Sequence, residues 1–259
     1  VAVVMSCSLV QRGALPLLPE AVRTWSALTC GADLVFALPA PCACAGAEAF
    51  ARAGVALLAA AGCDGLVFGA ETPDAALLME AAELLDSDSY RAALKAQLAG
   101  GARSFAAARQ AAAAKLASDE RVAALLDKPN NNLAVEYCRA IRSLAPRMEA
   151  YPLPRQGANH GEALHSAHGQ FASASALRKL WAEGGADAIA PYVPEAVFPL
   201  YQEAYAAGQY TDFSAAGRCE LALLRSACRG KAPFADIRGV SEGLEPRLEA
   251  AVRTSTTYD

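Results

Sequence analysis

Short apolar runs alternate with longer helical patterns along the first third of the chain. The ranges 1–5, 32–39 and 64–69 are short and apolar, as buried strands are. Between them, 19–29 and 45–61 place apolar side chains at the spacing of one helical face. Because strands that alternate with helices form parallel sheets through right-handed crossovers, the pattern predicts an α/β domain.

A long helical segment interrupts this alternation. Residues 74–126 follow a helical pattern almost throughout, and Gly100-Gly101 divides them into two or three helices. Beyond this segment, the pattern predicts a fourth strand at 147–153 and a helix at 173–182. We therefore expect a helical insertion within the α/β domain.

The last quarter of the chain is helical in pattern and follows a cluster of turn residues at 185–194. That cluster is the expected boundary between the α/β domain, residues 1–190, and an α-helical C-terminal region, residues 191–259. The helices expected in the second part are 195–207, 215–227 and 244–253.

Composition narrows the class of protein. Of 259 residues, 54% are apolar, which is enough for a sizeable core. The longest apolar run, 55–61, is too short to cross a bilayer, and no signal peptide is visible, so no membrane partner is expected. The eight cysteines are spaced irregularly, which favours free buried thiols and a reducing, cytoplasmic location.

The net charge of −4 argues against a broad nucleic-acid-binding face. Basic residues nevertheless recur along two helical segments, where they form either a local basic stripe or ordinary solvated helix faces. They are Arg103, Arg109, Lys115 and Arg121 on the first segment, and Arg139, Arg142 and Arg147 on the second.

Two helices open with polar residues that suit a nucleotide. Asn130 and Asn131 stand at the start of one, where they can cap it or offer an amide to a ribose or a base. Ser173 and Ser175 stand at the start of the other, with Arg178 one turn further on. The serines either simply cap this second helix or form a phosphate site with Arg178. A phosphate would suit this helix start because unpaired backbone N–H groups attract anions and an arginine can bind two phosphate oxygens at once.

Three further residues follow strand ends, where ligands bind in open α/β sheets. Gly69 ends the third strand and either lets a ligand approach the backbone or makes a simple turn. Glu71 either orients a ribose or is solvated. Arg155 follows the fourth strand and is either a phosphate or base contact or a surface arginine.

The sequence lacks the motifs of several common metal, catalytic and nucleotide-binding sites. His160, His165 and His168 do not have the spacing of a zinc site, and no Ser-His-Asp arrangement is legible. No Gly-x-Gly-x-x-Gly or Walker loop occurs, which argues against the dinucleotide-binding and P-loop classes.

Taken in order along the chain, these segments resemble the bacterial tRNA(Met) cytidine acetate ligases, a branch of the nucleotidyltransferase superfamily. The resemblance covers essentially the whole chain. It rests on 5–13 (Met-Ser-Cys-Ser-Leu-Val-Gln-Arg-Gly), 33–39, 68–71, 129–134 (Pro-Asn-Asn-Asn-Leu-Ala), Arg155 with Asn159-His160, 172–178 (Ala-Ser-Ala-Ser-Ala-Leu-Arg) and 240–247.

The resemblance implies a Rossmann-like α/β fold of nucleotidyltransferase type. It also implies an enzyme that joins ATP and acetate, with Mg²⁺, into acetyl-adenylate and pyrophosphate. The acetyl group then passes to the N4 amine of the wobble cytidine of elongator tRNA(Met). No DNA partner is implied.

Site residues follow from the same resemblance by matching motifs. It implies that Gly69, Asn130 or Asn131, and Arg155 contact ATP. It also implies that Ser173, Ser175 and Arg178 correspond to the superfamily's Ser/Thr-x-x-Arg phosphate motif and are the catalytic set.

The chain also departs from the family pattern. The family's His-x-Gly-His segment would lie before Val1, Glu20 stands near a family lysine, and the basic tail for tRNA would follow Asp259. We therefore expect the chain as given, read as a piece of a longer protein, to be inactive on its own. The alternatives are a small-molecule adenylyltransferase of the same superfamily and a non-catalytic nucleotide- or RNA-binding remnant.

Overall fold

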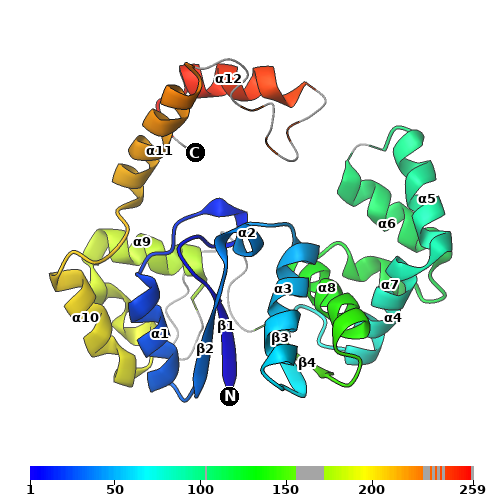
Figure 1. The fold of residues 1–259 in the computed structure, drawn as a ribbon, viewed down its shortest axis with the longest axis horizontal. Coiled ribbons are helices and arrows are strands. Elements are labelled where there is room, and N and C mark those ends of the chain that lie inside the picture. Colours follow the sequence, from blue (N-terminus) through cyan, green and yellow to red (C-terminus); the bar gives the residue numbers. More distant parts are fainter. Residues whose placement is uncertain are drawn as a thin grey trace.

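The computed structural model describes residues 1–102, 104–155, 172–229, 234, 237, 240 and 243–257. Its strands stand at the centre of the molecule with helices on either side, and the amino terminus lies at the lower edge of the view (Figure 1). The first strand rises from that terminus, so its carboxyl end points toward the upper side, where further helices extend (Figure 1).

Two parallel strand pairs form the centre of the fold. β1 (Ala2–Ser6) pairs with β2 (Leu34–Leu38), and β3 (Gly65–Ala70) pairs with β4 (Glu149–Pro154). Within the described residues no strand pairing joins one pair to the other. Instead, α3 (Ala47–Ala60) contacts β1, β2 and α8 (Pro129–Leu144), and α8 contacts β3 and β4. The predicted parallel α/β arrangement is confirmed, and in the described residues helix packing rather than strand pairing links its halves.

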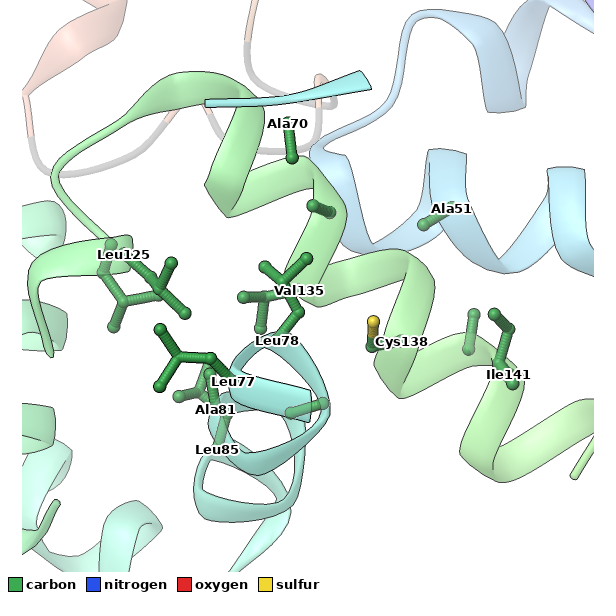
Figure 2. Packing of buried hydrophobic residues seen from close by; sticks show 14 of the residues in the cluster. Ala51, Ala70, Leu77, Leu78, Ala81, Leu85, Leu125, Val135, Cys138 and Ile141 are labelled. Carbon is green, nitrogen blue, oxygen red and sulfur yellow. The ribbon is translucent and has the colours of Figure 1, made fainter. Parts of the chain in front are cut away.

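The main core lies between α3, α8 and α4 (Ala75–Asp86). Ala51 of α3 and Ala140 of α8 are fully buried, and such small side chains let the two helices approach closely. Leu77 and Leu78 of α4 lie beside Val135 of α8 (Figure 2). Burying one leucine or valine side chain contributes about 1.5–3 kcal/mol, so this contact holds α8 firmly in place.

The helical insertion contains more helices than its periodicity predicts. Besides α4 it contains α5 (Asp88–Ala99), α6 (Phe105–Leu116) and α7 (Glu120–Leu125). Gly100 ends α5 as expected, but the chain also breaks at Ser87 and at Asp119. Each of these side chains accepts a hydrogen bond from a backbone N–H of the helix that follows it. Serine and aspartate are strong N-caps, so they restart a helix where the apolar pattern runs on.

The segment before the C-terminal helices packs on the first helix. α9 (Ala174–Gly184), the 3₁₀ turns η2 (Ala186–Tyr192) and η3 (Glu195–Val197), and α10 (Phe198–Ala206) follow one another. With α1 (Glu20–Thr29) they enclose a second core cluster around Trp181 and Ile189. Because η2 contacts both α9 and α10, the expected boundary near residue 190 lies inside packed structure. The division into 1–190 and 191–259 stays a prediction.

The last two helices stand apart from this cluster. α11 (Phe213–Ala227) and α12 (Leu244–Thr254) enclose a third, small cluster of Leu221, Phe234 and Val252. Figure 1 shows α11 rising above α9 and α10, while α5 and α6 extend from the opposite side of the molecule. The short elements η1 (Gln11–Gly13) and α2 (Ala40–Ala43) follow β1 and β2.

All eight cysteines are free thiols, as predicted. The expectation that they are buried holds only for Cys138, and Cys30 and Cys219 are exposed. Burial in an apolar core raises the pKa of the Cys138 thiol to about 12, so that thiol is neutral and inert. Among the described helices, none is both long and apolar enough to cross a membrane.

Candidate functional site

The carboxylate of Glu71, directly after β3, caps the N-terminus of α8. Its Oε1 accepts hydrogen bonds from the backbone N–H of Asn130 at 3.1 Å and from the Asn130 side-chain amide at 2.6 Å. Its Oε2 accepts the backbone N–H of Asn131 at 2.6 Å. The helix begins at Pro129, which has no N–H, so these are its first orphan donors. The anion at this helix start is therefore a side chain of the protein, and Glu71 is not simply solvated.

These donors also change the acidity of Glu71. Burial opposes its ionisation, but the bonds from the Asn130 side chain and from the Asn130 and Asn131 backbone outweigh it and lower the pKa of the carboxyl. A helix N-terminus carries partial positive charge, which favours the carboxylate in the same direction. Glu71 is thus ionised at neutral pH and ties the end of β3 to the start of α8.

The two neighbouring asparagines have different surroundings. The Asn131 side chain is 1% exposed: its Oδ1 accepts the backbone N–H of Thr72 at 2.9 Å, and its Nδ2 donates to Thr72 Oγ1 at 3.1 Å. Asn130 is only half-buried, and its Oδ1 accepts a hydrogen bond from an Arg155 guanidinium N–H at 2.7 Å. Asn131 therefore shapes the turn after β3, whereas Asn130 lies at the surface beside an arginine.

Arg155 lies against the end of β3, next to Gly69. The backbone N–H of Arg155 donates to the Ala70 carbonyl at 3.0 Å, which continues the β3–β4 pairing by one residue. A methyl group on Gly69 would lie 3.4 Å from Arg155 Cγ. The backbone of Gly69 is exposed, so the missing side chain leaves open surface beside the guanidinium. Gly69, Asn130, Asn131 and Arg155 thus form one contiguous group, and the contact of these residues with ATP stays a prediction.

A second group lies at the start of α9. Ser173 is the N-cap, and its hydroxyl accepts the backbone N–H of Ala176 at 3.2 Å and lies 3.2 Å from the hydroxyl of Ser175. Arg178 stands one turn later, and side chains on a helix lean toward its N-terminus. Its guanidinium carbon lies 5.8 Å from the centre of the Phe213 ring. The predicted cap is confirmed, and the helix start presents hydroxyls and N–H groups, with Arg178 one turn along the helix.

Arg155 and Arg178 are among several described arginines, with Arg23, Arg52 and Arg225, whose printed hydrogen bonds and ring contacts involve no carboxylate. Within the described residues no carboxylate forms an ion pair with either of them. By contrast, Arg109 and Arg139 both bind the buried carboxylate of Glu136, at 2.5 and 2.7 Å. An unpaired guanidinium has its charge available for a phosphate.

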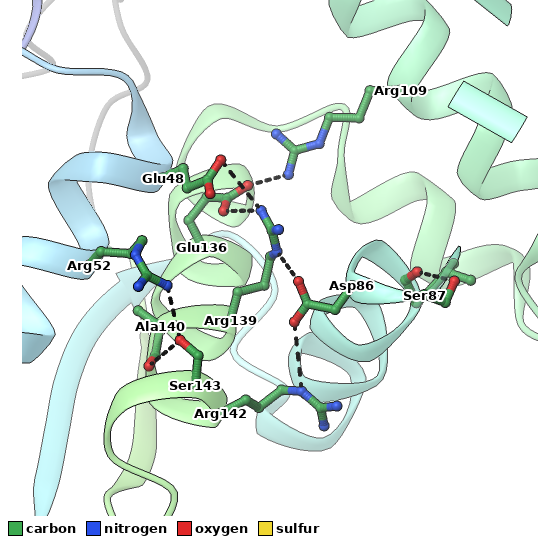
Figure 3. Close-up of polar contacts among 11 residues, drawn as sticks. Glu48, Arg52, Asp86, Ser87, Arg109, Glu136, Arg139, Ala140, Arg142 and Ser143 are labelled. Atoms are coloured by element: carbon green, nitrogen blue, oxygen red, sulfur yellow. Dashed lines mark hydrogen bonds and ion pairs between the residues drawn. The ribbon is translucent and has the colours of Figure 1, made fainter. Parts of the chain in front are cut away.

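Several of the basic residues considered either for a local stripe or for solvated helix faces bind carboxylates of the protein. Arg139 also binds Asp86 at 2.8 Å, and Arg109 and Arg139 converge on Glu136 from different helices (Figure 3). Arg121 pairs with Asp119 at 2.6 Å. Arg109 and Arg139 fasten the insertion to α8, whereas Arg121 pairs within the insertion, so these three arginines do not form a free cationic face. Arg103 lies outside the described residues.

The two groups lie on different sides of the β1–β2 pair. α8 packs on α3 and α4, whereas α9 belongs to the cluster around Trp181 with α1 and α10 (Figure 1). No hydrogen bond or ion pair joins the groups within the described residues. Residues 156–171, which connect them and include all three histidines, lie outside the described part of the chain. That both groups line one ATP site stays a prediction.

Sequence reasoning missed Arg23 of α1. Its guanidinium donates to the carbonyls of Ser6 at 2.7 Å and of Cys7, at the carboxyl end of β1. Burial lowers its pKa, and the nearby carboxylate of Glu20 partly opposes that change. Arg23 fixes the chain where β1 turns into η1. The signal available in the sequence was a basic residue between Val22 and Trp25, on a helix expected to present an apolar face.

The donor set fits ATP better than a resident metal ion. Two arginines that have no carboxylate partner in the described part of the chain, together with a serine-capped helix start, suit phosphates. No cluster of three His, Cys, Asp or Glu side chains occurs among the described residues, and Glu71 is already bound to α8. Mg²⁺ commonly binds through one or two carboxylates plus substrate phosphates, and the described residues offer no fuller cage.

A parallel α/β core with a serine-capped helix start and an arginine at a strand end agrees with the nucleotidyltransferase class predicted from the sequence. The chain belongs to the HIGH Nucleotidyl Transferase family, whose model matches residues 1–259. The sequence prediction of that superfamily is therefore confirmed.

Two relatives of assigned function show which members of this family the chain resembles. The tRNA(Met) cytidine acetate ligase of Syntrophotalea carbinolica is 35% identical over 98% of the chain, and that of Caldanaerobacter subterraneus is 34% identical over 100%. The chain spans 60% and 64% of the length of these two relatives.

Two solved structures also resemble the chain in fold. Thermotoga maritima TmcAL without ligand superposes with a TM-score of 0.89 at 29% identity, covering 99% of this chain and 62% of that one. The same protein bound with alpha-thio ATP gives a TM-score of 0.85 at 28% identity, covering 99% of this chain and 60% of that one.

Proposed function

We propose that this protein is an ATP-dependent acetate ligase that acetylates the N4 amine of the wobble cytidine of elongator tRNA(Met). One observation carries the proposal: over 98% of its length the chain is 35% identical to a tRNA(Met) cytidine acetate ligase. The likeness to a structure bound with alpha-thio ATP supports the use of ATP. The eight free thiols support a reducing, cytoplasmic location.

The residues divide into roles by their surroundings. Arg155 and Arg178 would bind phosphate oxygens, because no carboxylate of the described chain competes for them. Ser173 and Ser175 would add hydroxyl and helix N-terminal donors. Of the two asparagines we assign Asn130 to the nucleotide, since the Asn131 side chain is buried against Thr72.

The chemistry requires positioned charge more than a covalent nucleophile. A carboxylate oxygen of acetate attacks the α-phosphorus, and the bond to the β-phosphate breaks to release pyrophosphate. The cytidine amine then attacks the acetyl carbonyl, loses a proton and releases AMP. Both steps build negative charge on phosphate or carbonyl oxygens, which preorganised N–H donors and guanidinium groups stabilise. Mg²⁺, bound through the phosphates, would neutralise further charge.

A direct assay tests this function. The full-length protein is incubated with ATP, Mg²⁺, labelled acetate and an elongator tRNA(Met) transcript. A second transcript carries uridine at the wobble position, which has no N4 amine. The proposal expects ATP-dependent label in the first transcript only. Label in both transcripts, or in neither while a small molecule becomes adenylylated, would contradict it.

A further inference from the structure

The segment that leads into α11 is held against both the start of the chain and α9. The Thr211 backbone N–H donates to the Leu17 carbonyl at 2.8 Å, and its hydroxyl donates to the Pro16 carbonyl at 2.7 Å. Residues 16 and 17 come shortly after η1, at the carboxyl-terminal side of β1. Thr211 therefore fixes where the C-terminal helices leave the body of the protein.

An aromatic cluster fixes the same segment to α9. The Tyr210 ring stacks on Tyr205 with centroids 5.3 Å apart, and it meets the Trp181 ring edge-on at 5.7 Å. Trp181 is 3% exposed and lies on α9, three residues after Arg178. Contacts between aromatic rings add about 0.5–1.5 kcal/mol to their burial, so this cluster is well ordered. The residues beside Tyr210 are held close to Arg178.

Phe213 is the residue of this segment that reaches Arg178. Asp212 caps α11 by accepting the backbone N–H of Ala215 at 3.0 Å, which sets Phe213 as the first residue of the helix. Its ring lies 5.8 Å from the Arg178 guanidinium carbon. The ring is 38% exposed, because it also lines a cavity of about 490 Å³ beside Ala14 and Leu15.

The kind of contact decides what Arg178 can still do. A guanidinium is planar, and its N–H donors lie in the plane of the group. An aromatic ring attracts the cation through its face and forms no conventional hydrogen bond with those donors. A carboxylate at the same place would occupy two of them. A phenylalanine therefore orients Arg178 while leaving its donors free for phosphate.

We propose that Phe213 is a positioning residue for Arg178, so that the start of α11 completes the phosphate side of the ATP site. The inference rests on the proposed binding of ATP and adds a role for the C-terminal helices in it. Phe213 itself touches no reacting atom. Without its ring, Arg178 would sample more rotamers and bind phosphate less well.

The test compares Phe213→Leu, which keeps an apolar side chain without a ring, with Phe213→Tyr, which keeps the ring. Phe105→Leu is the matched control, because Phe105 is 60% exposed on α6 and far along the chain from this site. Dissociation constants for ATP and for adenosine are measured by calorimetry on the full-length protein with Mg²⁺. Thermal unfolding is recorded for each variant.

We expect Phe213→Leu to weaken ATP binding about two- to fivefold. This is the loss in affinity that corresponds to the free energy of one exposed cation–π contact, since each 1.4 kcal/mol changes a dissociation constant tenfold. Adenosine binding should not change, and Phe213→Tyr should restore ATP binding. In an Arg178→Ala background, Phe213→Leu should have no further effect. Equal losses for ATP and adenosine, or a loss that persists without Arg178, would overturn the inference.

The same variants separate this inference from the proposed function. If the parent protein binds ATP but acetylates no tRNA, the function fails while the binding data still decide the role of Phe213. If acetylation occurs and Phe213→Leu binds ATP like Phe105→Leu, only the role of Phe213 fails.

Discussion

The side-chain oxygen of Asn130 accepts a hydrogen bond from the Arg155 guanidinium at 2.7 Å, and this bond joins the start of α8 to the end of β4. Asn130 is bound in turn to the Glu71 carboxylate, which follows β3. Two strand ends and one helix start therefore meet in a single hydrogen-bonded chain. Arg155 is held by a neutral partner, so its charge is oriented without being neutralised.

Replacing Arg178 with alanine should weaken ATP use far more than it weakens folding. A hydrogen bond to a charged group is worth about 1.5–3 kcal/mol, or roughly 10- to 150-fold in the KM for ATP or in kcat/KM. The control is Lys179→Ala, the next residue on the same helix, whose side chain is 77% exposed. Steady-state kinetics against ATP measure both variants. Equal values for the two would rule out a phosphate role for Arg178.

Gly69→Ala should reduce ATP binding with little effect on stability. Gly69 has no positive φ, and the added methyl meets only the flexible Arg155 side chain, at 3.4 Å. If the nucleotide packs on this backbone, the methyl takes its space, and overpacking costs about 1–3 kcal/mol, or roughly 5- to 150-fold in Kd. Calorimetric titration with ATP measures the change. Gly54→Ala, on α3 with nothing near the new methyl, is the control and should bind ATP normally. Normal binding by Gly69→Ala would remove Gly69 from the site.

Glu71→Gln should destabilise the fold in a pH-dependent way. The glutamine amide would face one backbone N–H of α8 with its own donor, at a cost of about 1–3 kcal/mol at neutral pH. Because donors from α8 lower the pKa of Glu71 in the folded protein, its stabilising effect is complete above the ordinary glutamate pKa of about 4.3. It is lost as the pH falls from there through the lowered folded value.

Urea unfolding of the parent protein and of Glu71→Gln at a series of pH values measures this effect. The difference in unfolding free energy should be largest near neutral pH and should shrink under acid conditions. A difference that stays constant down to the acid unfolding limit would show that the Glu71 charge does not hold α8.

The two asparagines should respond differently to alanine. Asn131→Ala leaves the Thr72 N–H without its buried acceptor and should cost about 1–3 kcal/mol of stability. Asn130→Ala removes the acceptor that orients Arg155, so it should weaken ATP binding roughly 2- to 12-fold with a smaller loss of stability. Thermal melts and ATP titrations of both variants distinguish these outcomes. The reverse pattern would assign Asn131, rather than Asn130, to the nucleotide.

Local patterns in the sequence were enough to predict the strands and most of the helices. β1, β2 and β3 are short apolar runs, β4 overlaps the strand expected at 147–153, and α9 begins at a serine cap that the sequence marks directly. The breaks at Ser87 and Asp119 were missed, because a polar cap inside a continuing apolar pattern also fits a helix surface. Periodicity reports which face is apolar, and it does not report where a helix restarts.

The contacts that define the candidate site could not be read from local patterns. Glu71 and Asn130 are 59 residues apart, and the sequence offers no signal that a strand-end carboxylate caps that particular helix. Asn130 and Asn131 are adjacent in the sequence, yet the side chains of successive helix residues point about 100° apart. The Asn131 side chain is therefore buried, whereas that of Asn130 is only half-buried. The contact of Arg178 with Phe213 likewise depends on how α9 and α11 are placed.

We propose that Arg155 and Arg178 together hold the phosphates of one ATP molecule. A crystal structure of the full-length protein with alpha-thio ATP and Mg²⁺ tests it most directly. We expect the nucleotide beside Gly69, with both guanidinium groups within about 3.2 Å of phosphate oxygens and the Arg178 guanidinium still over the Phe213 ring. An analogue bound with only one of these arginines on its phosphates, or bound away from the ends of β3 and β4, would contradict the claim.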